Sequence, residues 1–215
     1  MQQDRRLLQT LQTLIGEADA QIHAFSIQDP WVKSMPLLLQ LPGFAVLNAM
    51  TVLAAIGDIH RFPTARHVVS YAGLAASIHE SGQTHRGGRM TKEGRRDLRA
   101  ALVEAAWMAV EHHRDWKARF ERLANRIGRQ KAIVAIARKL LVALWHILTY
   151  EQADRHADAQ VVSRKLLAWI SRTGVTPGKH RAPGTRARLL QHYLQQLGLT
   201  TEADDGGSAS FHPSG

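Results

Sequence analysis

Apolar residues recur at helical spacing in the first 26 residues of the chain. Steps of three and four residues place one apolar stripe along a helix from about Gln2 to Ser26, formed by Leu8, Leu11, Ile15, Ala18, Ile22 and Phe25. Such a stripe is typical of a coiled-coil arm. It spans fewer than four heptads, however, and a helix folded onto the chain's own core gives the same pattern.

Prolines separate this arm from the next part of the chain. The Asp29-Pro30 and Met35-Pro36 pairs predict two breaks, because proline disfavours helix in the preceding residue and has no backbone N–H to donate.

Several packed helices are predicted between residues 31 and 151. A short apolar segment, a turn at Pro42-Gly43 and a helix ending at Ile56 form a helix-hairpin-helix-like element, although Ala45 stands where a second glycine is usual. Such a turn lets the backbone approach a phosphate, and an ordinary corner between two helices explains it equally well. Further helices are predicted after caps at Thr64 and Thr91, and over residues 116–126 and 131–150.

Residues 77–88 interrupt this helical pattern. They show no apolar periodicity and contain three glycines and two histidines, which predicts a loop or a short irregular hairpin. A polar loop inside a helical domain is a common place for chemistry.

The pattern weakens beyond residue 151. Residues 161–170 and 186–197 are the remaining helical stretches, and residues 204–215 are polar and rich in Gly and Ser, which predicts disorder. We therefore predict an all-α fold in three parts: a helical arm over 1–30, a compact multi-helix domain over 31–151 with an irregular loop, and a partly helical extension over 152–215.

Composition narrows the class of protein. The 215 residues include no Cys, which excludes disulfide scaffolds, Cys-based metal sites and thiol catalysis. The apolar stretches are shorter than the ~20 residues that a membrane span needs. No apolar core follows the N-terminal arginines, so we expect no export signal and no membrane partner.

The formal net charge is +10, and most of it lies in one quarter of the chain. Between His85 and Lys139 there are fifteen Lys and Arg against six Asp and Glu. Such a concentration attracts polyanions, most commonly nucleic acid, although a solvated basic surface has the same composition. Cations at a helix start oppose the helix dipole, and a bound anion would relieve this conflict. The candidate phosphate-binding residues are Arg86, Arg89, Lys92, Arg95, Arg96 and Arg99.

Other chemistries find little support in the sequence. The twelve histidines lack metal-ligand spacing, and the adjacent His112 and His113 point to different sides of a helix, so we predict no metal site. Ser81 lies outside any G-x-S-x-G elbow. The acidic residues lie in predicted helices beside basic residues, whereas nuclease metal sites need acids at strand ends.

Several short motifs follow one another between residues 38 and 150. They are the Pro-Gly hairpin, a Gly-Asp-Ile-x-Arg-Phe turn, Tyr-Ala-Gly-Leu, a Glu-Ser-Gly loop, a Thr-Lys-x-Gly helix start with its arginines, and an Ala-Arg-Lys-Leu-Leu helix. In this order and spacing they resemble the C-terminal domain of insertion-sequence transposases of the IS110/IS116 family, which includes the pilin-gene inversion recombinases.

The resemblance implies DNA transposition or site-specific recombination by a serine nucleophile. It assigns that role to Ser81, whose hydroxyl would attack a DNA phosphate and form a phosphoserine link. Gly82, Gly87 and Gly88 would let the loop backbone approach the phosphate, and the nearby arginines would neutralise its charge. Taken without the resemblance, Ser81 reads as an ordinary turn serine.

The sequence also departs from the family. Members normally carry an N-terminal RuvC-like domain whose four acidic residues bind magnesium, and an element-encoded guide (bridge) RNA selects the DNA. No strand-rich acidic segment is present here. The resemblance therefore covers part of an enzyme, expected to bind no cofactor itself and to be inactive without that domain.

Two functional hypotheses follow from the resemblance. The first is a DNA-binding serine domain of a truncated or split transposase, active only if another polypeptide supplies the acidic half. The second is a non-catalytic module that co-assembles with a full-length transposase, or inhibits it, through the apolar stripe of the arm. The expected partners are DNA, guide RNA and a second copy or the RuvC-like domain, in the bacterial cytoplasm and on the nucleoid.

Overall fold

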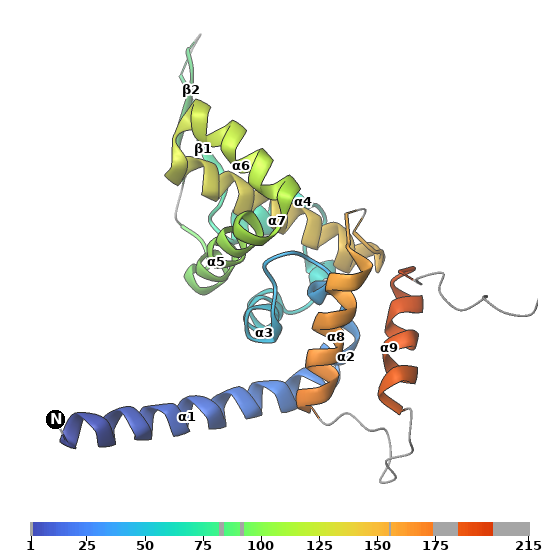
Figure 1. The fold of residues 1–215 in the computed structure, drawn as a ribbon. Helices are drawn as coiled ribbons and strands as arrows, with labels where there is room; N and C mark the ends of the chain where they lie inside the picture. The colour runs from blue at the N-terminus through green and yellow to red at the C-terminus, as the bar shows by residue number, and fades with distance from the viewer. Residues whose placement is uncertain (1, 82–83, 91–92, 155, 174–184, 200–215) are drawn as a thin grey trace, which may run out of the picture.

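The structure is a computed structural model that describes residues 2–81, 84–90, 93–154, 156–173 and 185–199. Helices dominate it (Figure 1), which confirms the all-α prediction. The helices are α1 (Gln2–Ser26), α2 (Trp31–Leu39), α3 (Val46–Ile56), the short 3-10 helix η1 (Ile59–Arg61), α4 (Ala65–Tyr71), α5 (Arg96–His112), α6 (Arg114–Ile127), α7 (Arg129–Tyr150), α8 (Ala159–Thr173) and α9 (Thr185–Gln196). Two strands, β1 (Ala76–Ser81) and β2 (Thr84–Met90), form a hairpin between α4 and α5.

Helix α7 is the centre of the core. It contacts α2, α4, α5, α6 and η1, and its predicted core positions are all buried: Ile133, Ile136, Ala137, Leu140, Leu141, Leu144, Trp145 and Leu148. Among the described residues it is the one helix long and apolar enough to cross a membrane, and 56% of that apolar window is buried inside the protein, as in a core helix.

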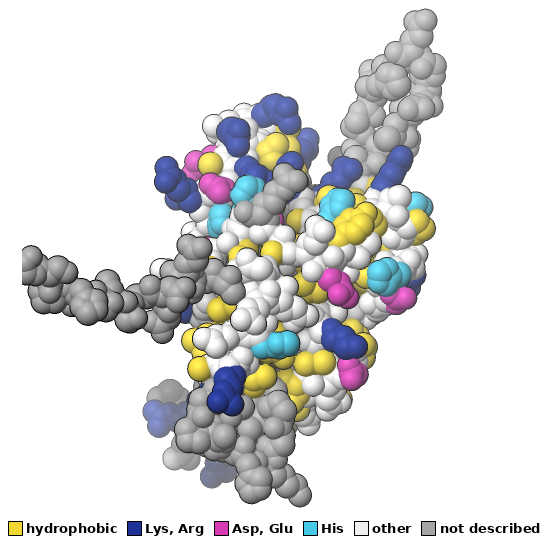
Figure 2. All heavy atoms as spheres, turned by 90° about the vertical axis from the view of Figure 1, so that its right-hand side faces the viewer, with side chains coloured by type: hydrophobic (Ala, Val, Ile, Leu, Met, Phe, Trp, Pro, Cys, Tyr) yellow, Lys and Arg dark blue, Asp and Glu magenta, His cyan; other side chains and the backbone are white. Residues whose placement is uncertain are grey.

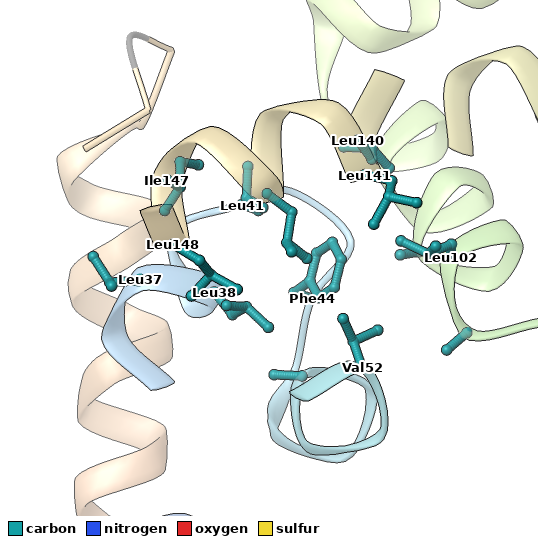
Figure 3. Close-up of a cluster of buried hydrophobic side chains, with 14 of the residues drawn as sticks. Leu37, Leu38, Leu41, Phe44, Val52, Leu102, Leu140, Leu141, Ile147 and Leu148 are labelled. Atoms are coloured by element: carbon teal, nitrogen blue, oxygen red, sulfur yellow. The ribbon is translucent and has the colours of Figure 1, made fainter. Parts of the chain in front are cut away.

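Phe44 joins the first helices to this core. It lies after the Pro42-Gly43 turn and is 1% exposed. Figure 3 shows its ring surrounded by side chains of α2, α3, α5 and α7, including Leu38, Val52 and Leu141. Burying a side chain of this size stabilises a fold by roughly 1.5–3 kcal/mol. Through Phe44, the turn thus packs α2 and α3 against α5 and α7, the helices that follow the β-hairpin.

Proline inside α2 overturns one prediction. Pro36 lies within α2 instead of ending a helix there. The residues around it, Met35 and Leu37–Leu39, are buried, and this burial offsets the backbone hydrogen bond that proline cannot make. The break expected at Asp29-Pro30 does occur, between α1 and α2.

The arm α1 projects from the helical body in Figure 1. The apolar stripe was expected either to form a coiled coil or to pack on the chain's own core. For the first half of α1 the second alternative is wrong, because Leu8 and Ile15 are 59% and 61% exposed. Its C-terminal end is anchored. The indole N–H of Trp169 in α8 donates to Ser26 Oγ at 2.8 Å, and Ser26 is fully buried.

Helices α8 and α9 pack more closely than the weak sequence signal indicated. Trp169 and Leu166 of α8 are buried, and the rings of Trp169 and Tyr193 of α9 lie 5.5 Å apart. The Nζ of Lys165 donates to the carbonyls of Leu39 and Leu41 at 3.2 and 2.7 Å. The disordered end predicted for residues 204–215 lies outside the described residues.

Candidate functional site

The segment that carries Ser81 is a β-hairpin, the second of the two alternatives left open for residues 77–88. The strands pair antiparallel, with His79 opposite Arg86, Ser81 opposite Thr84, and an irregularity between Ala76 and Ile78. Ser81 is the last residue of β1, next to the hairpin tip.

The remaining hairpin candidates fall into two groups. Arg86, Gly87, Gly88 and Arg89 belong to strand β2. Gly82 and Lys92, together with the predicted helix cap Thr91, lie outside the described residues.

The two chain segments at the base of the hairpin are tied together. The backbone N–H of Arg95 donates to the carbonyl of Tyr71 at 2.8 Å. Gly73, at φ 66°, lies against Gly94, and a Cβ added to Gly73 would sit 2.8 Å from the Gly94 nitrogen. Both glycines come from motifs that carried the resemblance, Tyr-Ala-Gly-Leu and Thr-Lys-x-Gly. Their contact fixes where the hairpin leaves the helical body.

Because of this contact, α5 starts later in the sequence than predicted. We predicted a helix from a cap at Thr91, but α5 begins at Arg96 with Arg95 in the capping position and no side-chain cap. Because the Arg95 N–H is bound to Tyr71, the chain turns into the helix only after this contact. Leu98 and Leu102 of the predicted core face are buried as expected.

Arg95 has partners within the chain. Its Nε lies 3.0 and 3.1 Å from the two carboxylate oxygens of Asp97, and its Nη1 donates to the Tyr71 hydroxyl at 3.3 Å. The Tyr71 hydroxyl in turn donates to the carbonyl of Ala55 at 3.2 Å. Hydrogen bonds from Arg95 and then from Arg61 lower the pKa of Tyr71. The N–H of Leu98, followed by Arg95, lowers the pKa of Asp97.

The other two arginines of this helix start differ from each other. The Nη1 of Arg99 donates to the Ala72 carbonyl at 3.2 Å, so Arg99 supports the end of α4. Arg96 is exposed and makes no hydrogen bond or ion pair with any described residue. Among Arg95, Arg96 and Arg99, Arg96 is therefore the most available to an external phosphate.

Arg61 and Tyr71 were not among the site residues predicted from the sequence. The guanidinium of Arg61 lies over the rings of Phe62 and Tyr71, 4.5 and 4.6 Å from their centroids. This places a cation beside the Tyr71–Arg95 hydrogen bond. The Gly-Asp-Ile-x-Arg-Phe motif contained Arg61, but a single sequence does not show that this turn faces α4.

The Pro42-Gly43 turn faces protein. Gly43 has φ 83°, and a Cβ there would collide with the carbonyl of Ala105 in α5. The adjacent Asn48 donates from Nδ2 to the Ala101 carbonyl at 3.1 Å. The close approach that the glycine permits is thus made to α5, and the phosphate contact considered for this turn stays a prediction.

Thr64 precedes α4 as predicted, but its hydroxyl bonds the His67 ring at 2.8 Å and caps no backbone N–H.

In the parts of the chain that the structure describes, no group of three or more His, Asp or Glu side chains could hold a metal ion.

Comparison with known proteins places this site in a family. The model of the transposase family IS116/IS110/IS902 matches residues 35–121, which include the Pro-Gly turn, the hairpin and α5. Residues 35–121 are therefore similar to the transposase domain of this family. The family resemblance drawn from the motifs is thereby confirmed.

Individual relatives agree with this assignment. The transposase for insertion sequence element IS1111A of Coxiella burnetii is 32% identical over 119 residues, 54% of this chain and 33% of its own length. A Pseudomonas aeruginosa protein named "Probable family 20 transposase" is 30% identical over 69% of this chain and 44% of its own length. The pilin gene-inverting protein of Moraxella bovis is 33% identical over 52% of this chain and 36% of its own length. The chain thus spans less than half the length of these relatives.

Proposed function

We propose that this IS110-family transposase domain binds DNA and contributes the serine nucleophile of DNA strand exchange. The observation that carries the proposal is the family match over residues 35–121, which contains Ser81 beside the hairpin tip and Arg96 beside the hairpin base. Relatives are named transposases and a gene-inverting protein, and both activities rearrange DNA. The excess of Lys and Arg between residues 85 and 139 supports a polyanionic partner.

The proposed reaction is a transesterification. The Oγ of Ser81 attacks a backbone phosphorus, an Oγ–P bond forms, and one bond between phosphorus and a sugar oxygen breaks. The serine hydroxyl loses its proton and the released sugar oxygen gains one, so no co-reactant is consumed. A phosphodiester carries a negative charge that repels a nucleophile, and Arg86, Arg89 and Arg96 are the residues that would neutralise it.

The magnesium expected from the family would come from another domain. The roles proposed here belong to this chain's own side chains. The guide RNA and the RuvC-like partner of the family likewise remain proposals.

A nicked, end-labelled DNA duplex tests the nucleophile. The protein is incubated with this substrate and magnesium, denatured and separated on a gel. A covalent band that persists in Ser77→Ala and disappears in Ser81→Ala supports the proposal, since both serines lie on strand β1. A band that survives Ser81→Ala assigns the chemistry to another residue.

One observation favours a second function, a non-catalytic module that joins or inhibits a full-length transposase. The first half of the apolar stripe of α1 is exposed, with Leu8, Leu11 and Ile15 at 59%, 45% and 61%. Mixing the chain with an intact relative and separating the products by size-exclusion chromatography tests this function. A shared peak supports it, and two unchanged peaks contradict it.

A further inference from the structure

Two hollows open along the helical pair α6–α7. Gly128, at φ 84°, is the one residue between these helices, and α6 folds back along α7 (Figure 1). The first hollow has a volume of about 360 Å³ and is lined by Arg119, Arg122, Leu123, Arg126 and Lys139. The second, about 540 Å³, shares Arg119 and Lys139 with the first and adds Arg138. Because Arg119 and Lys139 line both hollows, the two hollows adjoin each other, and together they are called the basic groove.

This basic groove, formed by Arg119, Arg122, Arg126, Arg138 and Lys139, has little negative charge in its lining. Asp154 is the acid that lines it, in the second hollow. Within the described residues the ion pair is Arg95–Asp97, so none of the five cations has a carboxylate within 4 Å. Figure 2 shows Lys and Arg side chains gathered in the upper part of the visible face. Five neighbouring cations repel one another unless an anion lies between them.

The spacing of the α6 arginines suits a regular polyanion. Arg119, Arg122 and Arg126 stand at positions i, i+3 and i+7, so they share one face over about 10 Å of helix. One DNA strand carries a charge about every 3.4 Å along its axis. The roughly 10 Å that the three arginines cover corresponds to about three phosphate intervals of one strand, so all three can reach phosphates of the same strand.

One of these arginines is held in place by an aromatic ring. The guanidinium of Arg119 lies 5.3 Å from the ring centroid of Trp116, a side chain that is buried. A stacked guanidinium loses less conformational freedom when it binds a phosphate. Arg119 lines both hollows, so the fixed cation lies where they join.

We propose that the basic groove binds the phosphate backbone of duplex DNA as a second contact surface. The inference rests on the proposed function, which supplies DNA as the partner, and it shares no residue with the hairpin or its base. Contacts to phosphates position a protein on DNA without selecting a sequence. The groove would therefore hold the duplex while the hairpin reaches the scissile phosphate.

Fluorescence anisotropy with a labelled DNA duplex tests the groove. Binding is measured over a series of salt concentrations for the full chain and for the double variant Arg122→Gln/Arg126→Gln. The matched control is Arg114→Gln/Lys117→Gln, which removes the same charge from exposed positions of the same helix outside the groove. We expect the slope of log Kobs against log salt to fall by about 2 in the groove variant, or about 0.9 per lost phosphate contact, and by less than half of that in the control.

The outcomes separate this inference from the proposed function. If the unaltered chain binds no DNA, both proposals fail. If it binds DNA and the groove variant keeps the slope of the control, the groove proposal is overturned while the proposed function stands. A slope change seen with an RNA duplex of the same sequence, but absent with DNA, overturns the assignment to DNA.

Discussion

Gly73 and Gly94 lie backbone against backbone where the hairpin leaves the helices. A Cβ on Gly73 would sit 2.6 Å from the Nη1 of Arg99 and 2.8 Å from the Gly94 nitrogen, and a Cβ on Gly94 would collide with the Gly73 nitrogen. The two residues are separated in sequence by the whole hairpin. Their contact, with the Arg95–Tyr71 hydrogen bond beside it, determines where Ser81 can be presented.

Gly94→Ala should therefore disturb the base of the hairpin. The added methyl group meets backbone that cannot move without displacing α4 or α5, and such overpacking costs about 1–3 kcal/mol. Urea denaturation measures the loss. Gly16→Ala is the control, because nothing lies within 4 Å of its added Cβ and alanine favours a helix by up to about 1 kcal/mol over glycine. Equal effects of the two substitutions would mean that the contact is not tight in solution.

Arg96→Gln and Arg95→Gln should affect the protein differently. The Arg96 side chain makes no hydrogen bond or ion pair with a described residue, so its loss should lower the salt slope of DNA binding by about 1 and leave thermal stability unchanged. Arg95 holds Asp97 and the Tyr71 hydroxyl, so its loss should also lower the melting temperature. Calorimetry and anisotropy on the same samples measure both effects. An unchanged slope in Arg96→Gln would place the phosphate elsewhere.

Stability should depend on pH through Lys165. Burial lowers the pKa of Lys165 from 10.5 to about 8, so between these pH values the unfolded chain binds more protons than the folded one. The free energy of unfolding contributed by this group should therefore rise from pH 8 to pH 10.5, by at most about 3 kcal/mol.

Two variants isolate this contribution. Lys165→Met should flatten the rise relative to the unaltered protein, while Lys33→Met, at an exposed position of α2, should keep it. Chemical denaturation at several pH values gives the comparison. Identical profiles for all three proteins would show that Lys165 has the same proton affinity folded and unfolded.

Ser26→Ala should loosen the arm from α8. The substitution removes the acceptor of the Trp169 indole N–H, and a hydrogen bond of this kind contributes about 1 kcal/mol. The expected result is a loss of this size together with a shift of the Trp169 indole N–H resonance. Ser163→Ala is a control, because that hydroxyl bonds within its own helix. An unshifted indole resonance would contradict the contact.

The α1 stripe should govern self-association. Leu8→Glu/Ile15→Glu places charges at exposed positions, so the fold should keep its melting temperature while any oligomer dissociates to monomer. Sedimentation velocity measures the oligomeric state. Gln9→Glu/Gln12→Glu, on exposed polar positions of the same helix, should leave the oligomer intact. A protein that is monomeric before substitution would contradict a role for the stripe in self-association.

Local pattern and long-range contact explain which parts of the fold could be predicted. Helix α7 was predictable because a long apolar periodicity indicates a helix however the helices pack against one another. The start of α5 was not, since the Arg95 N–H is held by Tyr71, a residue 24 positions earlier. Helix α8 carries only a short apolar pattern, and nothing in it shows that Trp169 reaches Ser26.

The same division applies to the candidate site. Charge counting correctly indicated a basic region, but it could not separate Arg95 and Arg99, which have partners inside the chain, from Arg96. Tyr71, which binds Arg95, and Ala72, which binds Arg99, lie 24 and 27 positions away. For the groove on α6–α7, the sequence showed only an excess of basic residues. The position of its hollows depends on how the two helices pack.

Gln40 has a consequence for dividing this protein into smaller pieces. Its amide is 3% exposed, and it accepts from the N–H of Asp154 at 2.8 Å while donating to the carbonyl of Gln152 at 3.4 Å. A fragment ending at residue 151 would leave this amide facing an apolar core with both its backbone partners removed, and would also remove Lys165 from the carbonyls of Leu39 and Leu41. We expect the smallest piece that folds by itself to extend through α8, well past the edge of the family match.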